Sequence, residues 1–351
     1  MRVFTYDALP IRVVFGAGTL TQLPDEVGRL GLANVLVLST PGQHALGQRL
    51  VDLLGPLAAG LHAHAKMHVP ADVAAAAVAE ATRINADGIV VVGGGSAVGL
   101  GKIVARDLGL PVVAVPTTYA GSEMTPIWGL TEDGVKTTAR DPKVLPRTVI
   151  YDPELTVGLP PGVSATSGMN AMAHAVEALY APDANPIAST MAEQSIAALA
   201  RGLPRVVADP ADLDARGDAL YGAWLAGVVL GTVGIGLHHK LCHTLGGTFD
   251  LSHADVHTVI LPHAAAYNAA AAPDALARVA AALGVSEAPG GLYDLAKNLG
   301  APTGLAAIGM PESGLDRAAD LAVAKPYPNP APVTRDGVRV LLESAFHGRR
   351  P

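Results

Sequence analysis

The first half of the chain alternates short apolar runs with segments whose apolar positions recur at helical spacing. Runs rich in Val, Ile and Leu are typical of strands buried in a parallel sheet, and helical segments of this length suit crossover helices. We therefore predict a Rossmann-like α/β domain. Its strands are expected at 34–38, 66–69, 88–92, 111–115, 126–138 and 148–152, the fifth segment turning at 132–134, and its helices at 43–54, 71–84 and 96–106.

After residue 160 the β signal stops, and long segments rich in Ala and Leu follow. This pattern predicts an all-helical domain, with the boundary near Leu159–Pro161. We expect an α/β domain over 1–159 and a helical domain over 160–351. The predicted helices of the second domain are 168–181, 186–200, 212–233, 239–246, 256–268 and 273–283.

Composition narrows the class of protein. The 351 residues are 50% hydrophobic and 16% charged, which excludes a disordered chain. The formal net charge of −7 argues against a nucleic-acid-binding protein. Cys242 is the one cysteine of the sequence, so neither a disulfide framework nor a cysteine-only metal cluster can form.

The stretch 219–237 is uncharged and close in length to a membrane span. It contains several glycines and runs directly into His238, His239 and Lys240, so a buried helix of a helical domain explains it better. The N-terminus carries Asp7 and Arg12 where a signal peptide would be apolar. We therefore expect a soluble, cytoplasmic protein that binds neither membrane nor nucleic acid.

The segment 90–96 is a predicted strand that runs into Gly93, Gly94, Gly95 and Ser96 at the start of a helix. Glycines allow the backbone to approach a phosphate, and a helix N-terminus offers free N–H groups and partial positive charge. An ordinary strand–turn–helix connection does not need three consecutive glycines. The pattern therefore favours a phosphate site of a dinucleotide over a plain turn.

Two further strand ends belong to the same predicted cofactor site. Thr117, Thr118 and Ser122 follow the strand at 111–115, where they can contact a nicotinamide or ribose, since ligands of open α/β sheets bind at the carboxyl ends of strands. Ser39 ends the strand at 34–38, and an acidic residue there would hold the ribose 2′-hydroxyl and reject a 2′-phosphate. Because no acid stands there, both NADH and NADPH are expected cofactors.

Histidines concentrate in one part of the second domain. The chain has 12 His, and six of them fall within 238–263. His239 and His243 are four residues apart on one face of a predicted helix, and His174 follows Asn170 by the same spacing. Single buried histidines are usually structural, but a dense group suits a metal ion or a proton-transferring site. Neutral imidazoles of His174, His239 and His253 would suit zinc or ferrous iron, although the position that would supply a carboxylate holds Asn170.

Together these features resemble the iron-containing (group III) alcohol dehydrogenase superfamily, to which dehydroquinate synthase and glycerol dehydrogenase are distantly similar. The resemblance covers nearly the whole chain, from Phe15–Gly18 to the C-terminal helices. It implies an α/β dinucleotide domain, an all-α domain and an active site in the cleft between them. The family's metal ligands, one Asp and three His, fall on Asn170, His174, His239 and His253.

Two departures from the common pattern of that family resemble its maleylacetate reductase branch. Gly99 stands at the Asp position of the GGGSxxD motif, ahead of Lys102, and Asn170 replaces the ligand Asp. The segments that carry the similarity to the branch are 117–126, 140–153, 170–180 and 239–249.

Membership of that branch implies reduction of the 2,3 double bond of maleylacetate to 3-oxoadipate, in the degradation of aromatic rings. Hydride adds to the carbon β to the ketone, charge develops on the ketone oxygen, and a proton must reach the α carbon. In an alcohol dehydrogenase a metal polarises the carbonyl. Here we expect His174, His239, His243 or His253 to do this, so that no metal is essential and Asn170, His174, His239 and His253 form a vestigial metal site.

A dicarboxylate substrate also needs cationic partners, and the candidates are Lys136, Arg140, Lys240, Lys325 and Arg335. Lys240 beside His239 and Arg335 after the Pro-rich segment 325–330 are the preferred pair. Tyr119 and Asn170 are further candidate substrate contacts. The resemblance also implies a homodimer, in which Val3–Tyr6 and Arg12–Phe15 would form an edge hairpin that pairs across a two-fold axis.

Other functions stay open at the level of the sequence. A metal-dependent alcohol, aldehyde or oxo-acid reductase would depend on its metal. A lyase similar to dehydroquinate synthase would show no net change in nicotinamide absorbance. A nucleotide-binding relative without activity would bind the cofactor and not turn over.

Overall fold

The computed structural model describes residues 3–351, which form two compact units. One unit is Leu9–Leu159, and the other consists of Pro160–Pro351 and the N-terminal segment that ends at Ala8. The chain thus divides at the predicted position near residue 159. The segment before Leu9, in contrast, groups with the helical unit and not with the α/β unit.

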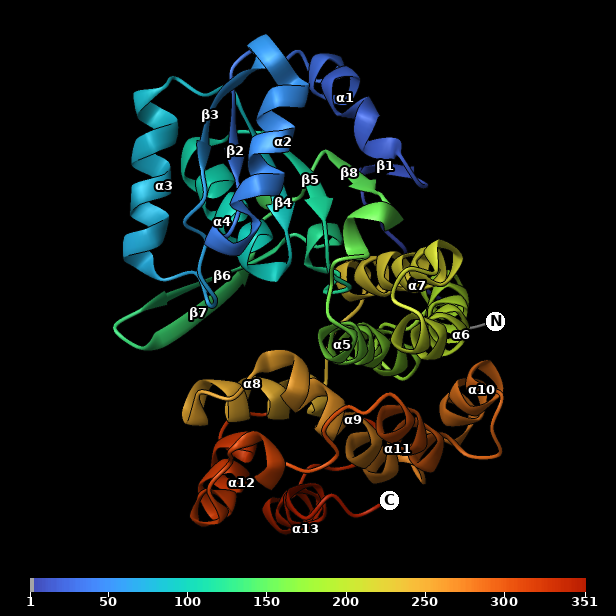
Figure 1. Cartoon of the computed structure of the whole chain (residues 1–351). Helices are drawn as coiled ribbons and strands as arrows, with labels where there is room; N and C mark the ends of the chain where they lie inside the picture. The colour runs from blue at the N-terminus through green and yellow to red at the C-terminus, as the bar shows by residue number, and fades with distance from the viewer. Residues whose placement is uncertain (1–2) are drawn as a thin grey trace. The chain divides into compact units, whose positions relative to one another are not determined.

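Within the described residues, the α/β unit is built on a six-stranded sheet with the strand order β1-β8-β5-β4-β2-β3 (Figure 1). Every neighbouring pair is parallel, as the apolar runs predict. Its strands are β1 (Arg12–Phe15), β2 (Val35–Leu38), β3 (Ala58–His62), β4 (Gly88–Gly93), β5 (Val112–Pro116) and β8 (Thr148–Tyr151). The strands β2, β4, β5 and β8 are buried along their whole length, which explains their continuous apolar sequences.

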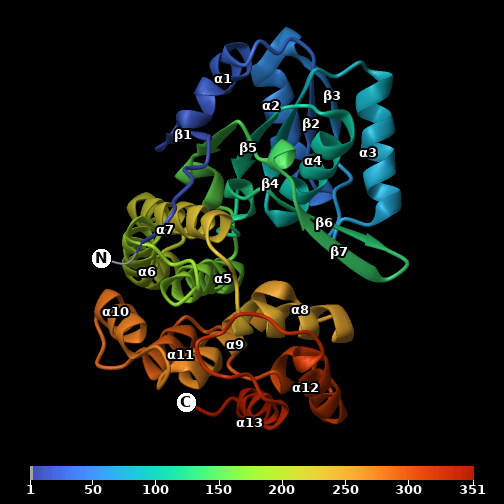
Figure 2. The ribbon, with the colours of Figure 1, turned by 180° about the vertical axis from the view of Figure 1, so that it is seen from behind.

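Helices cover both faces of this sheet: α1 (Leu23–Arg29), α2 (His44–Leu54), α3 (Ala71–Arg83) and α4 (Gly95–Leu108). Side chains of α1 and α2, among them Leu23 and Leu50, share one apolar cluster with Val90 and Val113 of the sheet. Helix α4 lies on the opposite face, and α3 packs beside it (Figure 2).

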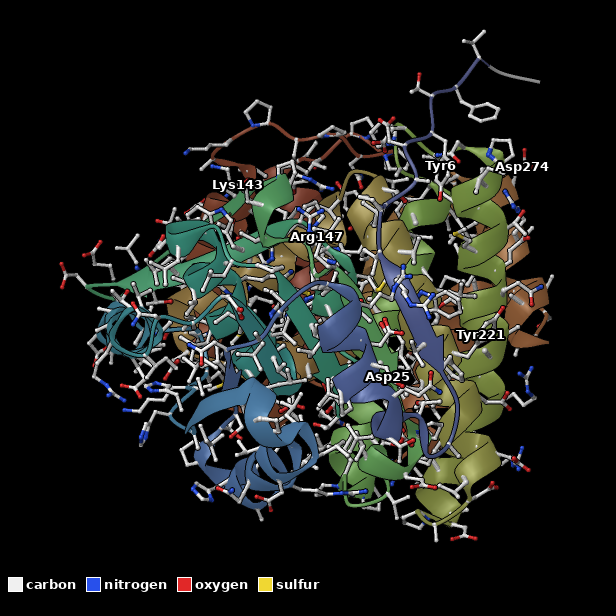
Figure 3. The ribbon with its side chains drawn as sticks, turned by 90° about the horizontal axis from the view of Figure 1, so that it is seen from above. Tyr6, Asp25, Lys143, Arg147, Tyr221 and Asp274 are labelled. Carbon is white, nitrogen blue, oxygen red and sulfur yellow. The ribbon has the colours of Figure 1, made fainter. Side chains whose placement is uncertain are left out.

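An antiparallel hairpin of β6 (Ile127–Glu132) and β7 (Val135–Arg140) follows β5. Its turn residues Asp133 and Gly134 both have positive φ, of 49° and 75°, which is the arrangement that favours Asp-Gly in two-residue hairpin loops. This confirms the turn expected at 132–134. Lys143 and Arg147, which connect the hairpin to β8, are exposed on the unit (Figure 3).

The predicted strand at 66–69 is wrong. Ala58–His62 forms the edge strand β3 instead, and its small residues Ala, Ala and Gly gave no β signal in the sequence. His68 and Val69 have positive φ, of 63° and 49°, which is incompatible with a strand. Thr131 holds this turn, because its hydroxyl donates to the His68 carbonyl at 2.8 Å and its N–H to the Val69 carbonyl at 3.0 Å.

The expected N-terminal hairpin is not formed within the chain. Arg12–Phe15 is β1, and it pairs in parallel with β8. The residues Val3–Tyr6 are not in a strand, and Pro10, which has no N–H, separates them from β1.

The helical unit consists of α5 (Pro161–Leu179), α6 (Pro186–Ala208), α7 (Leu213–Thr232), α8 (Leu237–Phe249), α9 (His253–Asn268), α10 (Pro273–Leu283), α11 (Ala288–Asn298), α12 (Leu315–Val323) and α13 (Arg335–Phe346). Helix α5 begins seven residues before the predicted start at residue 168, because Pro161 is well placed in a first helical turn. Side-chain oxygens of Asn185 and Asp212 accept from the N–H groups of Ala188 and Ala215 and so cap α6 and α7.

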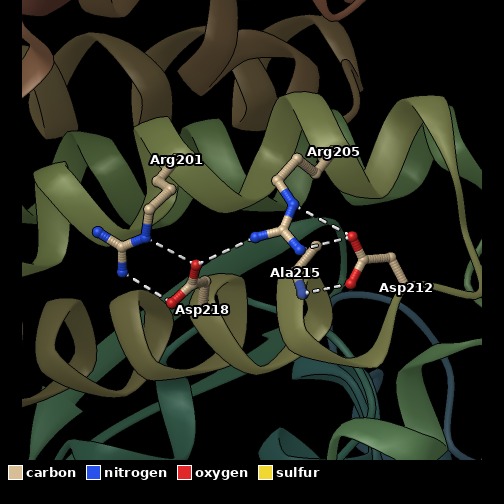
Figure 4. Close-up of polar contacts among 5 residues, drawn as sticks. All are labelled: Arg201, Arg205, Asp212, Ala215 and Asp218. Carbon is tan, nitrogen blue, oxygen red and sulfur yellow. Dashed lines mark hydrogen bonds and ion pairs between the residues drawn. The ribbon is translucent and has the colours of Figure 1, made fainter.

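Helices α6 and α7 pack closely against each other. Glycines permit the close approach: a Cβ on Gly222 would lie 3.0 Å from the Ser195 carbonyl oxygen. On the exposed side, Arg201 pairs with Asp218, and Arg205 with Asp212 (Figure 4). Gly222, in the uncharged stretch of α7, therefore serves helix packing.

Among the described helices, none alone has the length and apolar character needed to cross a membrane. Taken together, α7 and α8 pass that test by length and composition, but they are bent by 98° at the break between them.

Candidate active site

The glycine segment forms a cradle between β4 and α4. Gly93 ends β4 with φ of 143°, a conformation that side chains rarely adopt, and α4 begins at Gly95. A Cβ on Gly94 would lie 2.8 Å from Cγ2 of Thr118 and 2.9 Å from its Oγ1. The first N–H groups of α4 have no partner within the helix. The cradle thus fits a phosphate group of a dinucleotide, as Gly93, Gly94, Gly95 and Ser96 predict.

The other predicted cofactor residues gather at the same edge of the sheet, because β5, β4 and β2 are parallel neighbours. The N–H of Thr117 donates to the Gly93 carbonyl at 3.1 Å, and the Gln43 amide donates to the Thr117 hydroxyl at 2.7 Å. Ser39 ends β2, is fully buried, and donates its hydroxyl to the Thr40 carbonyl. Ser39, Thr117 and Thr118 therefore lie at the same edge of the sheet as the glycine cradle.

Lys102 positions Ser122, and the sequence gave it no such role. The side chain of Lys102 is fully buried, and its Nζ donates to carbonyl oxygens of Ser122, Thr125 and Ile127 at 2.6–2.8 Å. The hydroxyls of Ser122 and Thr125 accept from it as well. Burial lowers the pKa of Lys102 to about 7, while the five surrounding oxygens favour its ammonium form. Lys102 thus ties α4 to the loop that carries Ser122.

The histidines of the helical unit form one continuous cluster. His174 comes from α5, while α8 contributes His239 and His243 and α9 contributes His253. The rings of His174 and His239 stack with centroids 5.0 Å apart, and those of His243 and His253 stack at 6.2 Å. His239 links the two pairs, because its ring centroid lies 6.3 Å from that of His243. The structure therefore brings together all four predicted catalytic histidines.

Exposure changes across the cluster. His238 and His257 are fully buried, His174 and His239 are 5% and 3% exposed, and His243 is exposed. Burial, together with the neighbouring histidines, lowers the pKa of His238 and of His257 well below the usual range, so both are neutral near pH 7. The cluster thus has a buried end, where His238 and His257 are neutral, and an end at His243 that solvent can reach.

The residues at the base of the cluster fit a divalent metal ion. Donor atoms of His174, His239 and His257 lie within 4.8 Å of one another. Oδ1 of Asn170 is buried and has no hydrogen-bond partner among the described residues. Imidazoles and a carbonyl oxygen suit zinc or ferrous iron, although this donor set has no carboxylate. His257 belongs to this group, whereas the resemblance named His253.

A groove of about 330 Å³ in the helical unit is lined by two lysines, a histidine and two threonines together with the apolar Leu321 and Ala324. Lys240 and His243 of α8 lie on one side of it, and Lys325 follows α12. Neither lysine forms an ion pair with a described residue. The groove therefore offers two ammonium groups beside an exposed histidine of the cluster.

The remaining predicted substrate contacts receive no support from the structure. Arg335 pairs with Asp316 and Asp320, at 2.8 Å each, at the start of α13. Tyr119 is fully buried in the α/β unit. Asn170, in contrast, lies at the base of the histidine cluster, one helical turn before His174.

Reasoning from the sequence missed Glu177, which is 2% exposed and faces the cluster from α5. The available signal was helical spacing: Asn170, His174 and Glu177 stand at positions i, i+4 and i+7, which share one face of a helix. His257 was part of the dense histidine segment, but its spacing did not mark it as a member of the site.

Comparison with known proteins agrees with this arrangement. The sequence profile described as "Iron-containing alcohol dehydrogenase" matches residues 10–153, and "Fe-containing alcohol dehydrogenase family, C-terminal" matches 164–346. These two matches together cover most of the chain, and they define the class of protein.

Relatives that are similar over the full length indicate one branch of this class of protein. The chain is 58% identical to maleylacetate reductase of Burkholderia cepacia over 100% of both chains. It is 57% identical to that of Sphingobium indicum over 99% of both. The crystal structure of maleylacetate reductase from Rhizobium sp. strain MTP-10005 is 54% identical, covers 100% of both chains and has a TM-score of 0.97. The chain belongs to the iron-containing alcohol dehydrogenase family, in its maleylacetate reductase branch.

Proposed function

We propose that this protein reduces the conjugated double bond of maleylacetate to 3-oxoadipate with NADH or NADPH. The observation that carries the proposal is the 53–58% identity, over 99–100% of the chain, to proteins named maleylacetate reductase. The geometry of each unit supports it, since one unit holds a dinucleotide cradle and the other a histidine cluster beside a cationic groove.

The α/β unit is proposed to bind the cofactor. The pyrophosphate would lie against Gly93–Ser96, with Thr117, Thr118 and Ser122 holding the nicotinamide end. Bound NADH or NADPH supplies the hydride. Ser39 is neutral and would not repel a 2′-phosphate, so we propose that both cofactors are accepted.

The groove is proposed to hold the substrate carboxylates. Lys240 and Lys325 provide two positive charges, which match the two negative charges of maleylacetate. This assigns to Lys325 the role that the sequence gave to Arg335. His243 lines the same groove, so a substrate bound there lies against the exposed end of the histidine cluster.

The histidines are proposed to stabilise the enolate and deliver the proton. Nδ1 of His239 faces Glu177 and its Nε2 faces Nδ1 of His174, so these two rings are occupied within the cluster. The N–H of His243 or His253 can donate to the ketone oxygen as charge develops on it. An imidazole that carries a proton can then protonate the α carbon. We propose that no metal is essential, because the ligand set centred on Asn170 lacks the carboxylate that would balance a divalent charge.

Variants of the groove test the substrate assignment. Lys325→Ala and Lys240→Ala should each raise the KM for maleylacetate about tenfold or more, because a hydrogen bond to a charged group is worth about 1.5–3 kcal/mol. The KM for NADH should stay unchanged. Arg335→Ala is the matched control, since its guanidinium is occupied by aspartates. An equal effect of all three substitutions would contradict the assignment.

A metal-dependent alcohol or aldehyde reductase is the second candidate, and the close donor atoms of His174, His239 and His257 favour it. A divalent ion held there would polarise a substrate carbonyl. Elemental analysis before and after chelation separates the two candidates. Activity on maleylacetate that survives complete removal of zinc and iron supports the proposal; activity that is lost and returns with the metal supports the second candidate.

A further inference from the structure

The buried carboxylate of Glu177 faces two donors at once. Its Oε1 accepts from the backbone N–H of His238 at 2.9 Å. Its Oε2 forms a short hydrogen bond with Nδ1 of His239. The side chains of Glu177 and His239 are 2% and 4% exposed, so water does not compete for these contacts.

The contact to His238 also ties Glu177 to the start of α8, because this N–H belongs to the first turn of the helix. A carboxylate is stabilised at a helix N-terminus by the free N–H groups and the partial positive charge there. The effect of its charge extends further: it contributes to raising the pKa of the Cys242 thiol and of the Tyr180 hydroxyl, in both cases after burial. The carboxyl group of Glu177 is therefore held in place by one backbone and one side-chain hydrogen bond.

The hydrogen-bond pattern fixes the tautomers of two histidines in sequence. An ionised carboxylate only accepts, so Nδ1 of His239 must carry a hydrogen. Nε2 of a neutral His239 is then an acceptor. It lies 2.8 Å from Nδ1 of His174, so that nitrogen must be the donor of this second bond.

We infer that Glu177 is a positioning residue, which sets the ring orientation and tautomer of His239 and, through it, of His174. It lies on the face of α5 that also carries Asn170, two helical turns further along. The role of Glu177 in catalysis rests on the proposed function, whereas the assignment of the two tautomers does not.

Glu177→Gln provides a test with a defined outcome. A glutamine side chain has one acceptor and one amide donor. The backbone N–H of His238 cannot reverse its role, so it retains the oxygen and the amide NH₂ faces His239. Nδ1 of His239 must then accept, and its hydrogen moves to Nε2.

The measurement is two-bond ¹H–¹⁵N correlation on protein labelled with ¹⁵N-histidine, with His239→Gln used to assign the signal. We expect the Nδ1–H pattern for His239 in the unmodified protein and the Nε2–H pattern in Glu177→Gln. Tyr180→Phe, at the residue directly after α5, is the control and should keep the Nδ1–H pattern. An Nε2–H pattern in the unmodified protein would overturn the inference, even if the variant fails to fold.

Steady-state kinetics test whether Glu177 contributes to catalysis. Loss of a residue that orients a working imidazole commonly costs about 10–100-fold in activity. Glu177→Gln should lower kcat for maleylacetate by that factor and leave the KM for NADH unchanged. An unchanged kcat in Glu177→Gln would show that Glu177 has no role in catalysis. If the unmodified protein shows the expected tautomer but does not reduce maleylacetate, only the proposed function is overturned.

Discussion

At the scale of single residues, the proposed site depends on the size of one side chain and on the polar groups of two others. A Cβ on Gly94 would collide with Thr118, and Asn170 places a neutral, unpartnered amide oxygen at the base of the histidine cluster among the described residues. His243 presents an imidazole at the exposed end of a cluster whose other members are mostly buried. Each of these features predicts the effect of a substitution.

Gly94→Val should raise the KM for NADH at least tenfold. The new Cβ would lie under 3.0 Å from two atoms of Thr118, so it displaces a proposed cofactor contact and also fills the cradle. Steady-state kinetics with varied NADH measure the effect. Gly28→Val is the matched control, because no atom lies within 4 Å of that Cβ position in α1. An unchanged KM in Gly94→Val would refute the phosphate cradle.

His243→Ala and His253→Ala should each lower turnover about 10²–10⁴-fold, the usual contribution of general acid–base catalysis. NADH binding should persist, because the proposed cofactor residues belong to the other unit. If these histidines only pack the helical unit, the variants will instead melt at lower temperature and keep their turnover. Melting temperature and turnover measured on the same samples distinguish the outcomes, and a destabilised but fully active His243→Ala would exclude a catalytic role.

At the scale of helices and strands, burial explains which elements the sequence revealed. Strands β2, β4, β5 and β8 are buried on both faces and read as apolar runs, so they could be predicted. Strand β3 is made of small residues at the sheet edge, and the turn at His68 depends on contacts with Thr131, which lies 63 residues away in the sequence. Such partners cannot be found from local pattern.

The same distinction applies to the candidate site. The glycine cradle and the histidine segment are local in sequence and were predicted. Glu177 meets His239 across 62 residues, and Lys325 reaches the groove from the chain after α12. Helical spacing places Glu177 on the face of Asn170 and His174, but its contact with His239 and the place of Lys325 in the groove follow from tertiary packing.

His263 of α9 should make the free energy of unfolding depend on pH. Burial lowers the pKa of His263 to about 4, below the value near 6.5 of an unfolded chain. Between these values the unfolded chain binds a proton that the folded chain does not, so stability falls as pH falls from about 6.5 to about 4. The loss amounts to about 3 kcal/mol from this residue.

Urea unfolding of the protein and of His263→Gln over this pH range measures the contribution. The variant should lose less free energy of unfolding as pH falls, and His44→Gln, at an exposed position, should behave like the unmodified protein. Parallel pH profiles of all three would show that His263 does not titrate in this way.

At the scale of the whole molecule, the division into two units separates cofactor chemistry from proton chemistry. The proposed nucleotide residues lie in Leu9–Leu159, and the histidines, Glu177 and the groove lie in Pro160–Pro351. Substitutions in one unit are therefore expected to change one set of kinetic constants and to spare the other.

We propose that the protein is a homodimer. In the N-terminal segment, Val3 is fully exposed and Phe4 is 42% exposed, so a partner chain could bury both side chains. Light scattering at micromolar concentration should give twice the mass of one chain. A variant that lacks residues 1–6 should shift towards monomer, and a monomeric full-length protein would contradict the proposal.

The most direct test of the central claim follows the hydride. The protein is incubated with maleylacetate and NADH deuterated at C4, on either face in separate reactions, and the product is examined by NMR and mass spectrometry. Conjugate reduction predicts 3-oxoadipate with an intact ketone and, from one of the two cofactors, a single deuterium on the carbon β to that ketone, with one NADH consumed per product. Deuterium on a new carbinol carbon, or no product with NADH bound, would contradict the account.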